Sequence, residues 1–213
     1  MKNYSTHSAR TDDPYKVSTG FAVMKRVFDI IGSAICIILC APLFVIIYIA
    51  IKREDSGPAI FSQERVGYKG RTFTIYKFRS MVDDAEKEGE VILCKEDDDR
   101  LTATGRFLRD HHIDELPQLW NVLKGDMSFV GPRPERKYFV EKIIAENPDY
   151  RYLYRLRPGL FSEATLYNGY TDTMEKMLRR LSMDLDYLKE QSILKDIKII
   201  SETLYSILSG KKF

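Results

Sequence analysis

The sequence predicts an α+β fold that is mostly helical and associated with a membrane. Three observations support this prediction. Residues 30–51 form a run of 22 positions without a charged side chain, residues 52–80 carry β-branched and aromatic residues around a glycine break, and apolar residues recur at helical spacing after Arg100. The first pattern indicates a membrane helix, the second a small β-hairpin, and the third a set of helices, some of them amphipathic.

Composition excludes two broad classes of protein. The 213 residues hold 33 basic and 31 acidic side chains, a net charge of +2, whereas general nucleic-acid binders carry a basic excess. A hydrophobic content of 44% excludes a disordered chain, and three cysteines without a C-x-x-C pair favour a reducing compartment. The distribution of charge divides the chain into a polar tail (1–20), a membrane segment (21–52) and a polar domain (53–213).

The uncharged run is long enough to enter a bilayer, because a membrane helix needs about 20 apolar residues. A cleaved signal peptide fits poorly, since the run is too long and no small-x-small cleavage site follows it. Lys25 and Arg26 precede the run, and Lys52 and Arg53 follow it. Positive residues mark the cytoplasmic side of a membrane segment, and here both flanks are positive.

Pro42 lies inside this run and predicts a kink. It lacks an N–H group and clashes with the carbonyl of Ile38. A break there leaves halves of 12 and 10 residues, roughly 18 and 15 Å long, and neither crosses a hydrocarbon core of about 30 Å. A re-entrant helix follows from this reasoning. A single span is equally compatible with the residues, because neighbouring helices can satisfy the freed carbonyl.

The polar domain begins with two segments of opposite charge. Residues 52–80 carry seven basic and three acidic side chains and are expected to form two short strands or a hairpin. Residues 82–99 carry nine acidic and two basic side chains, which favours a solvated loop. Cation binding by residues 97–99, three consecutive aspartates, is the less favoured interpretation.

Three helices are expected after Arg100. The first is indicated by a common apolar face of Leu116, Leu119, Trp120 and Leu123, with a proline, Pro117, in its first turn and a glycine, Gly125, at its end. The second follows Pro134 and runs to Asn147. The third carries an apolar stripe of Ile193, Ile197, Ile200, Leu204 and Ile207. Core packing is the ordinary explanation for that stripe, and contact with a membrane surface, with Lys211 and Lys212 near lipid phosphates, is the alternative.

Asp114 and Glu115 are the candidate catalytic residues. They stand at the start of the first of these helices, where a helix N-terminus stabilises carboxylates, so capping is the simplest explanation for either alone. Four cationic side chains suited to phosphate occur in the neighbouring motifs: Lys77 and Arg79 on one face of the second strand, Arg109, and Arg133 in the stiff segment GPRP.

This combination suggests a carboxylate that works on a phosphate. A carboxylate can attack phosphorus and form an acyl phosphate. A divalent cation together with arginines would remove the repulsion between the two anions, and Mg²⁺ normally binds through one or two carboxylates and substrate phosphates. A transition-metal site for hydrolysis, formed by Asp114 and Glu115 with His111 and His112, is the alternative, but His-His-x-Asp-Glu is not an established helical ligand spacing. The sequence contains no Walker loop, G-x-G-x-x-G or G-x-S-x-G motif.

The motifs KRVFDI, FSQERVG, YKFRSM, DELPQLWNVLKGDMSFVGPRP and RPG, together with the proline in the apolar run, resemble the bacterial monotopic phosphoglycosyl transferases. The resemblance extends from about Lys25 to near the C-terminus, and the chain resembles the short, catalytic-core form of that family. It implies a re-entrant helix bent at Pro42 on the cytoplasmic face of the bacterial inner membrane, with a catalytic domain at 53–213. Lys77, Arg109 and Arg133 match family positions associated with phosphate.

The resemblance also implies the reaction. A UDP-sugar donates its sugar-1-phosphate to polyprenyl (undecaprenyl) phosphate, the first membrane step of glycan assembly, with Asp114 as nucleophile, Glu115 completing the pair and Mg²⁺ beside them. A membrane-attached, metal-dependent phosphohydrolase is the alternative function, and a non-catalytic membrane adaptor is the third. A homodimer is compatible with the sequence, and no nucleic-acid partner is expected.

Two departures from the family pattern are visible. Ala41 stands where the family often has serine before the central proline, so no hydroxyl at that position can satisfy a freed carbonyl. The segment RPGLFSEATLYNG keeps Arg157, Pro158 and Gly159 but loses the usual Trp-Ala-Gln part. This second change keeps the adaptor alternative open and leaves the identity of the sugar undetermined.

Overall fold

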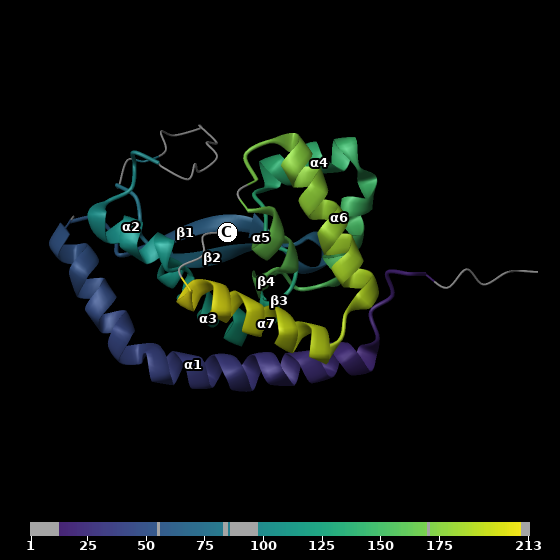
Figure 1. The fold of residues 1–213 in the computed structure, drawn as a ribbon, viewed down its shortest axis with the longest axis horizontal. Coiled ribbons are helices and arrows are strands. Elements are labelled where there is room, and N and C mark those ends of the chain that lie inside the picture. The colour runs from purple at the N-terminus through teal and green to yellow at the C-terminus, as the bar shows by residue number, and fades with distance from the viewer. Residues whose placement is uncertain (1–12, 55, 83–84, 86–97, 170, 210–213) are drawn as a thin grey trace, which may run out of the picture.

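A helix of 36 residues, α1 (Thr19–Glu54), runs along one side of the molecule, and the remaining elements lie on the other side of it (Figure 1). The computed structural model describes residues 13–54, 56–82, 85, 98–169 and 171–209. Most of the predicted polar tail and acidic loop, Asp97, Lys211 and Lys212 lie outside the described residues. The described chain is mostly helical with two small sheets, as the sequence predicts.

The first part of α1 is fastened to the domain by charged side chains. Asp29 is buried, and its Oδ1 accepts hydrogen bonds from the Ser128 hydroxyl at 3.0 Å and the Phe129 N–H at 2.9 Å. The Arg26 guanidinium donates to the carbonyls of Val122 and Leu123 at 2.6 and 2.7 Å. Most charged residues of the segment KRVFDI therefore hold the long helix in place.

The middle of α1 presents apolar side chains outward. Ile38 and Leu39 are 72% and 73% exposed, and exposed aliphatic residues continue to Ile49. The helix is continuous through Pro42, and its later part turns away from the line of its first part (Figure 1). Near the end of α1, Ile47 and Ile51 return to the domain and pack against Phe78 and Leu108.

The predicted hairpin consists of β1 (Ile60–Val66) and β2 (Thr72–Phe78), paired antiparallel with Phe61 opposite Lys77. A short 3₁₀ turn, η1 (Tyr68–Gly70), joins the two strands. The expectation of two short strands around a glycine break is confirmed.

The residues after the acidic stretch form α2 (Ala103–Asp110), a 3₁₀ turn η2 (Ile113–Glu115) and α3 (Gln118–Lys124). Pro117 precedes α3, and Gly125 ends it with φ 97°, a conformation that favours glycine. These boundaries agree with the sequence. The predicted common apolar face does not, because Trp120 is 54% exposed while Leu119 is buried.

Two short parallel strands, β3 (Ser128–Val130) and β4 (Gly159–Phe161), bring the GPRP and RPG motifs together. The Gly131 N–H donates to the Phe161 carbonyl at 3.0 Å, and the Gly159 N–H donates to the Pro132 carbonyl at 2.9 Å. A Cβ on Gly159 would lie 2.1 Å from the Gly131 nitrogen, so only glycine fits this crossing.

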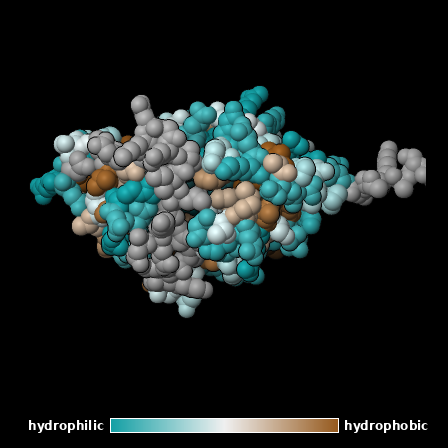
Figure 2. Space-filling view, turned by 90° about the horizontal axis from the view of Figure 1, so that it is seen from above, coloured by the Kyte–Doolittle hydropathy of each residue, from teal (hydrophilic) through white to brown (hydrophobic). Residues whose placement is uncertain are grey.

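The helices α4 (Lys137–Glu146), α5 (Glu163–Asn168) and α6 (Met174–Glu190), with the 3₁₀ helix η3 (Pro148–Arg155), form the bulk of the domain. The expected second helix corresponds to α4. Their largest apolar core consists of Val66, Phe139, Val140, Ile143, Tyr150, Leu153, Met177, Leu181 and Leu185. On the face seen from the side opposite α1, the described residues are mostly hydrophilic, with a few apolar side chains among them (Figure 2).

The last helix, α7 (Ile193–Leu208), lies above α1 in the view of Figure 1 and packs against β3 and β4. Its orientation confirms only part of the expectation that the apolar stripe packs in the core, because Ile200 packs against the core while other stripe residues face outward. The residues buried on this helix are Asp196, Ile199, Thr203 and Ser206. By contrast, Ile197 and Leu204 of the stripe are 54% and 47% exposed. The inner face of α7 instead carries Ile199, which packs in the core, and Asp196, which accepts a hydrogen bond from the Tyr187 hydroxyl.

Candidate active site

A pocket of about 480 Å³ opens between the hairpin, η2, the GPRP loop and the segment from α5 to α6. All six side chains that the sequence singles out for chemistry line it: Lys77, Arg79, Arg109, Asp114, Glu115 and Arg133. Pro42 is not part of this pocket. Residues separated by up to 56 positions in the chain thus meet in one place, although their roles remain predictions.

A tight turn places the two acidic residues. His111 ends α2, and His112 adopts the left-handed conformation with φ 54° and ψ 19°, which is uncommon for a residue other than glycine. The chain then enters η2, which holds Asp114 and Glu115 in consecutive positions. This reversal turns both carboxyl groups away from α2 and into the pocket.

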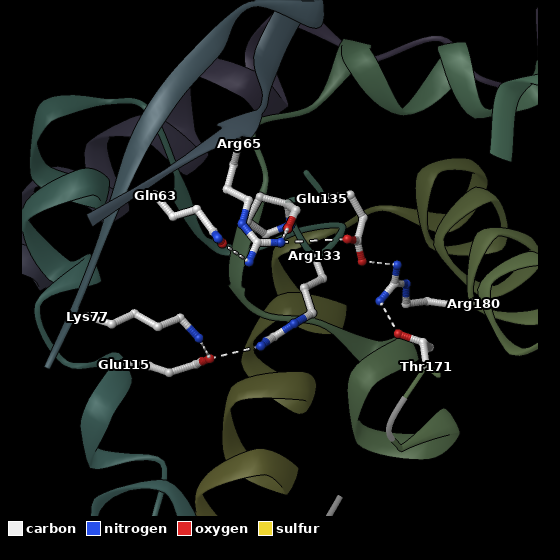
Figure 3. Close-up of polar contacts among 9 residues, drawn as sticks. Gln63, Arg65, Lys77, Glu115, Arg133, Glu135, Thr171 and Arg180 are labelled. Atoms are coloured by element: carbon white, nitrogen blue, oxygen red, sulfur yellow. Dashed lines mark hydrogen bonds and ion pairs between the residues drawn. The ribbon is translucent and has the colours of Figure 1, made fainter. Parts of the chain in front are cut away.

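Glu115 lies between two cations (Figure 3). Its Oε1 accepts a hydrogen bond from Lys77 Nζ at 2.6 Å and another from Arg133 Nη2 at 2.9 Å. Burial alone would raise the pKa of Glu115, but Arg133 and Lys77 outweigh burial and hold the pKa below its usual range. Glu115 is therefore ionised at neutral pH.

Asp114 has a different environment from its neighbour. It is buried, and burial is the main reason that its pKa rises to about 6, an effect that Lys77 opposes and Glu115 increases. Among the described residues, no side chain donates a hydrogen bond to its carboxylate or forms an ion pair with it. A buried carboxylate with few partners is a reactive oxygen nucleophile once it is ionised.

The loop that carries Arg133 is fixed on both sides. The glycine crossing with RPG holds its first residue, and the Val66 N–H donates to the Glu135 carbonyl at 2.9 Å. Arg65 Nη1 donates to the Pro134 carbonyl at 3.3 Å. Two prolines stiffen the loop further, so the Arg133 guanidinium is held in place against Glu115.

A second charged cluster, which the sequence did not indicate, lies beside the same pocket. Arg65 and Arg180 line the pocket, and Glu135 joins these two arginines without lining it. Glu135 pairs with Arg180 and lies 3.6 Å from Arg65, measured from Oε2 to Nη1. Arg180 Nη1 also donates to the Thr171 hydroxyl at 2.8 Å (Figure 3). The sequence could have indicated Arg65, because it lies in the FSQERVG motif. It could not have indicated Arg180, because only the folded chain brings α6 to this site.

The histidines do not support a transition-metal site. His111 is exposed, and its Nδ1 lies 2.8 Å from the Phe107 carbonyl. Within the part of the chain that the structure describes, no group of three or more His, Cys, Asp or Glu side chains is arranged to hold a metal ion. Of the three consecutive aspartates, Asp98 is paired with Arg100 at 2.6 Å, which accounts for its burial without a cation.

Asp114 and Glu115 carry the kind of oxygen donors that Mg²⁺ prefers. This ion is usually bound by one or two carboxylates together with substrate phosphates and water. Both contacts of Glu115 described above reach Oε1, so Oε2 and the Asp114 carboxylate supply hard oxygen donors at the pocket wall. The surrounding cations would then face the phosphates of a substrate rather than the metal ion.

Comparison with known proteins gives a consistent result. The model of a family described as bacterial sugar transferase matches residues 21–210. A UDP-N-acetylgalactosamine-undecaprenyl-phosphate N-acetylgalactosaminephosphotransferase of Aeromonas hydrophila is 40% identical over 190 residues, which are 89% of this chain and 45% of that protein. The region matched by the family model agrees with the extent of the resemblance seen in the motifs.

Two further relatives differ in length. A UDP-glucose:undecaprenyl-phosphate glucose-1-phosphate transferase of Caulobacter vibrioides is 43% identical over 87% of this chain and 70% of its own length. An exopolysaccharide production protein of Rhizobium leguminosarum is 36% identical over 90% of this chain and 98% of its own. The chain spans less than half the length of several other relatives.

Proposed function

Since this chain belongs to the bacterial sugar transferase family, we propose that it transfers a sugar-1-phosphate from a UDP-sugar to undecaprenyl phosphate, releasing UMP. The printed names of the relatives carry these two substrate classes, with N-acetylgalactosamine or glucose as the sugar. The observation that carries the proposal is the pocket in which Asp114 lies among four cationic side chains. No relative described above is named a phosphohydrolase, so that alternative has no support.

The charges of the pocket suit a diphosphate. Arg133 and Lys77 neutralise Glu115, while Arg79 and Arg109 add two further cations to the wall. Arginine forks match phosphate oxygens, and cations fixed in a partly buried pocket stabilise the charge that develops during phosphoryl transfer. The donor is therefore held with its diphosphate beside Asp114.

Asp114 is the nucleophile of the first step. An oxygen of its carboxylate attacks the phosphorus that bears the sugar, and the bond from that phosphorus to the bridging oxygen breaks. The bridging oxygen keeps the electron pair and leaves with UMP, so the sugar phosphate is bound to Asp114 as an acyl phosphate. In the second step an oxygen of undecaprenyl phosphate attacks the same phosphorus and frees the carboxylate.

Glu115 and the cations support these steps without forming bonds to phosphorus. Glu115 orients Lys77 and Arg133 by accepting a hydrogen bond from each. Asp114 and Glu115 would hold Mg²⁺, which would supply neutralisation of the charge between the carboxylate and the phosphates. Arg109 lies at the end of α2 and lowers the cost of ionising Asp114.

The acceptor is a lipid, so the site must lie close to the bilayer surface. We propose that α1 is the re-entrant membrane helix, bent near Pro42, and that both of its positive flanks remain at the cytoplasmic face of the inner membrane. Support comes from the exposed apolar side chains in the middle of α1, from its turn in Figure 1, and from its return to the domain at Ile47 and Ile51.

Turnover in detergent or nanodiscs tests the proposed function. A panel of UDP-sugars is supplied with undecaprenyl phosphate and Mg²⁺, and UMP is measured. We expect sustained UMP release that needs the lipid phosphate and stops when Mg²⁺ is chelated. Sustained release without the lipid would indicate a phosphohydrolase, and tight donor binding without any release would indicate an adaptor.

A further inference from the structure

A second cavity, of about 210 Å³, adjoins the active-site pocket. Its walls include six apolar side chains: Ile113, Leu116, Leu160, Phe161, Leu204 and Ile207. They come from η2, β4 and α7, elements that are distant in the sequence. The function proposed above uses none of these six residues.

The two cavities share a wall at the site of chemistry. His112, Glu115, Arg133 and Thr165 line both of them, whereas Asp114 lines only the larger one. A ligand whose charged end lies against Arg133 in the first cavity can therefore extend an apolar end into the second. The junction suits a molecule with a phosphate head and a hydrocarbon tail, because each part meets a wall of its own polarity.

The second cavity also opens onto an apolar surface. Leu204 lines the cavity and is 47% exposed, so it belongs both to the wall and to the outside of α7. On the same helix, Leu194, Tyr205 and Leu208 are 80%, 73% and 87% exposed. Exposed apolar side chains of this kind on one helix are typical of contact with lipid.

We propose that this cavity binds the first isoprene units of the lipid phosphate acceptor and guides its phosphate to the sugar phosphate on Asp114. This inference rests on the proposed function. Polar side chains such as Ser162 and Thr203 also line the cavity. A sugar would still be a poorer occupant than a hydrocarbon, because hydroxyl groups that face the six apolar side chains would have no hydrogen-bond partner. An isoprenoid chain has no hydroxyl groups to leave without partners, and its remaining units leave the cavity past Leu204 toward the bilayer.

A matched pair of tryptophan substitutions tests the inference. Leu204→Trp fills the cavity, and Leu208→Trp adds the same side chain one turn further along α7, outside it. Two quantities are measured on the full chain in nanodiscs: the KM for undecaprenyl phosphate, and the rate of adduct formation with the UDP-sugar chosen from the panel and no acceptor. We expect Leu204→Trp to raise the KM about tenfold without changing the rate of adduct formation, and Leu208→Trp to change neither.

Equal increases in KM for both variants would overturn the inference, since they would show that α7 only seats the domain on lipid. An unchanged KM for Leu204→Trp would overturn it as well. If Leu204→Trp forms no adduct, Leu204→Ser replaces it, and the same rise in KM is required. Failure of the unmodified protein to form an adduct would instead refute the proposed function, so the two failures are distinguishable.

Discussion

Glu115 lines the pocket, whereas Glu135 pairs with two arginines that line it, and each glutamate is held between two cationic side chains (Figure 3). The Glu135 cluster is the more deeply buried, because the side chains of Arg180 and Glu135 are only 6% and 10% exposed. The Glu115 cluster includes Arg133, which is 35% exposed, and it adjoins Asp114. Similar ion pairs thus hold a loop in place in one cluster and, in the proposed function, face the substrate in the other.

The difference lies in what each cluster has beside it. Glu135 connects the GPRP loop to β1 and α6, so its hydrogen bond and ion pairs hold Arg133 in place. Glu115 stands next to a carboxyl group whose pKa burial raises to about 6. Changes at the first cluster should therefore act mainly on stability, and changes at the second mainly on turnover.

Asp114→Asn should have the largest effect. The neutral amide preserves the shape of the side chain but is not a nucleophile, so UMP release should fall on the order of 10⁴-fold. Thermal unfolding serves as the control and should show no loss of stability, because burial already disfavours the charged form of Asp114. Undiminished turnover would remove Asp114 from the mechanism.

Glu135→Gln should affect stability more than any other change at the second cluster. Breaking a buried ion pair leaves Arg180 without its charge partner and costs about 3–5 kcal/mol of unfolding free energy. Chemical denaturation measures this loss. The comparison of the two clusters would be wrong if the variant kept its full stability and lost turnover instead.

Glu115→Gln should lower turnover more than stability. Lys77 and Arg133 would lose the carboxylate that orients them, and turnover should fall about 100-fold. Stability should change less than in Glu135→Gln, because Arg133 is more exposed to water than Arg180. Parallel measurements of kcat and of unfolding for both variants decide whether the two clusters differ as described.

Asp184 provides a test through pH. Burial is the main cause that raises its pKa from 3.8 to about 7, against Arg180 and the Ser162 hydroxyl, while Glu135 and Glu163 add to the rise. The folded state therefore binds this proton more tightly than the unfolded state, and stability should fall as pH rises between about 4 and 7. Asp184→Asn should remove this dependence and be more stable at pH 8, on the order of 2 kcal/mol. An unchanged pH profile would contradict this assignment.

The smallest effect is expected at a surface pair. Lys137 Nζ lies 3.9 Å from Glu141 Oε1, and both side chains are more than 60% exposed. Lys137→Ala should change the unfolding free energy by less than about 0.5 kcal/mol and leave turnover unchanged. A large effect would show that this exposed ion pair contributes to stability or turnover as strongly as the buried clusters do.

Local signals predicted several elements from the sequence. Pro117 and Gly125 bound α3, and the glycine break separated the strands of the hairpin, because proline and glycine act on their own backbone. Asp114, Glu115 and the four candidate cations could be selected because they occur in short motifs whose side chains are suited to binding phosphate. Their convergence in one pocket follows from the fold.

Long-range packing determined what the sequence did not reveal. Helical spacing identified the stripe on α7 but not the direction it faces, since buried polar residues such as Thr203 occupy the inner side. Arg180 carries no local sign of its partner Glu135, which lies 45 positions away. The RPG motif supports the GPRP loop through a glycine crossing that only the paired strands β3 and β4 create.

The mass of the protein after reaction with donor alone tests the central claim most directly. The purified chain is incubated with a turnover-competent UDP-sugar and Mg²⁺, quenched in acid without undecaprenyl phosphate, and analysed intact and as peptides. We predict one added sugar phosphate per chain, located on Asp114 and lost on addition of the lipid phosphate. Sustained turnover by a protein that never carries this group, or carries it on another residue, would contradict the account.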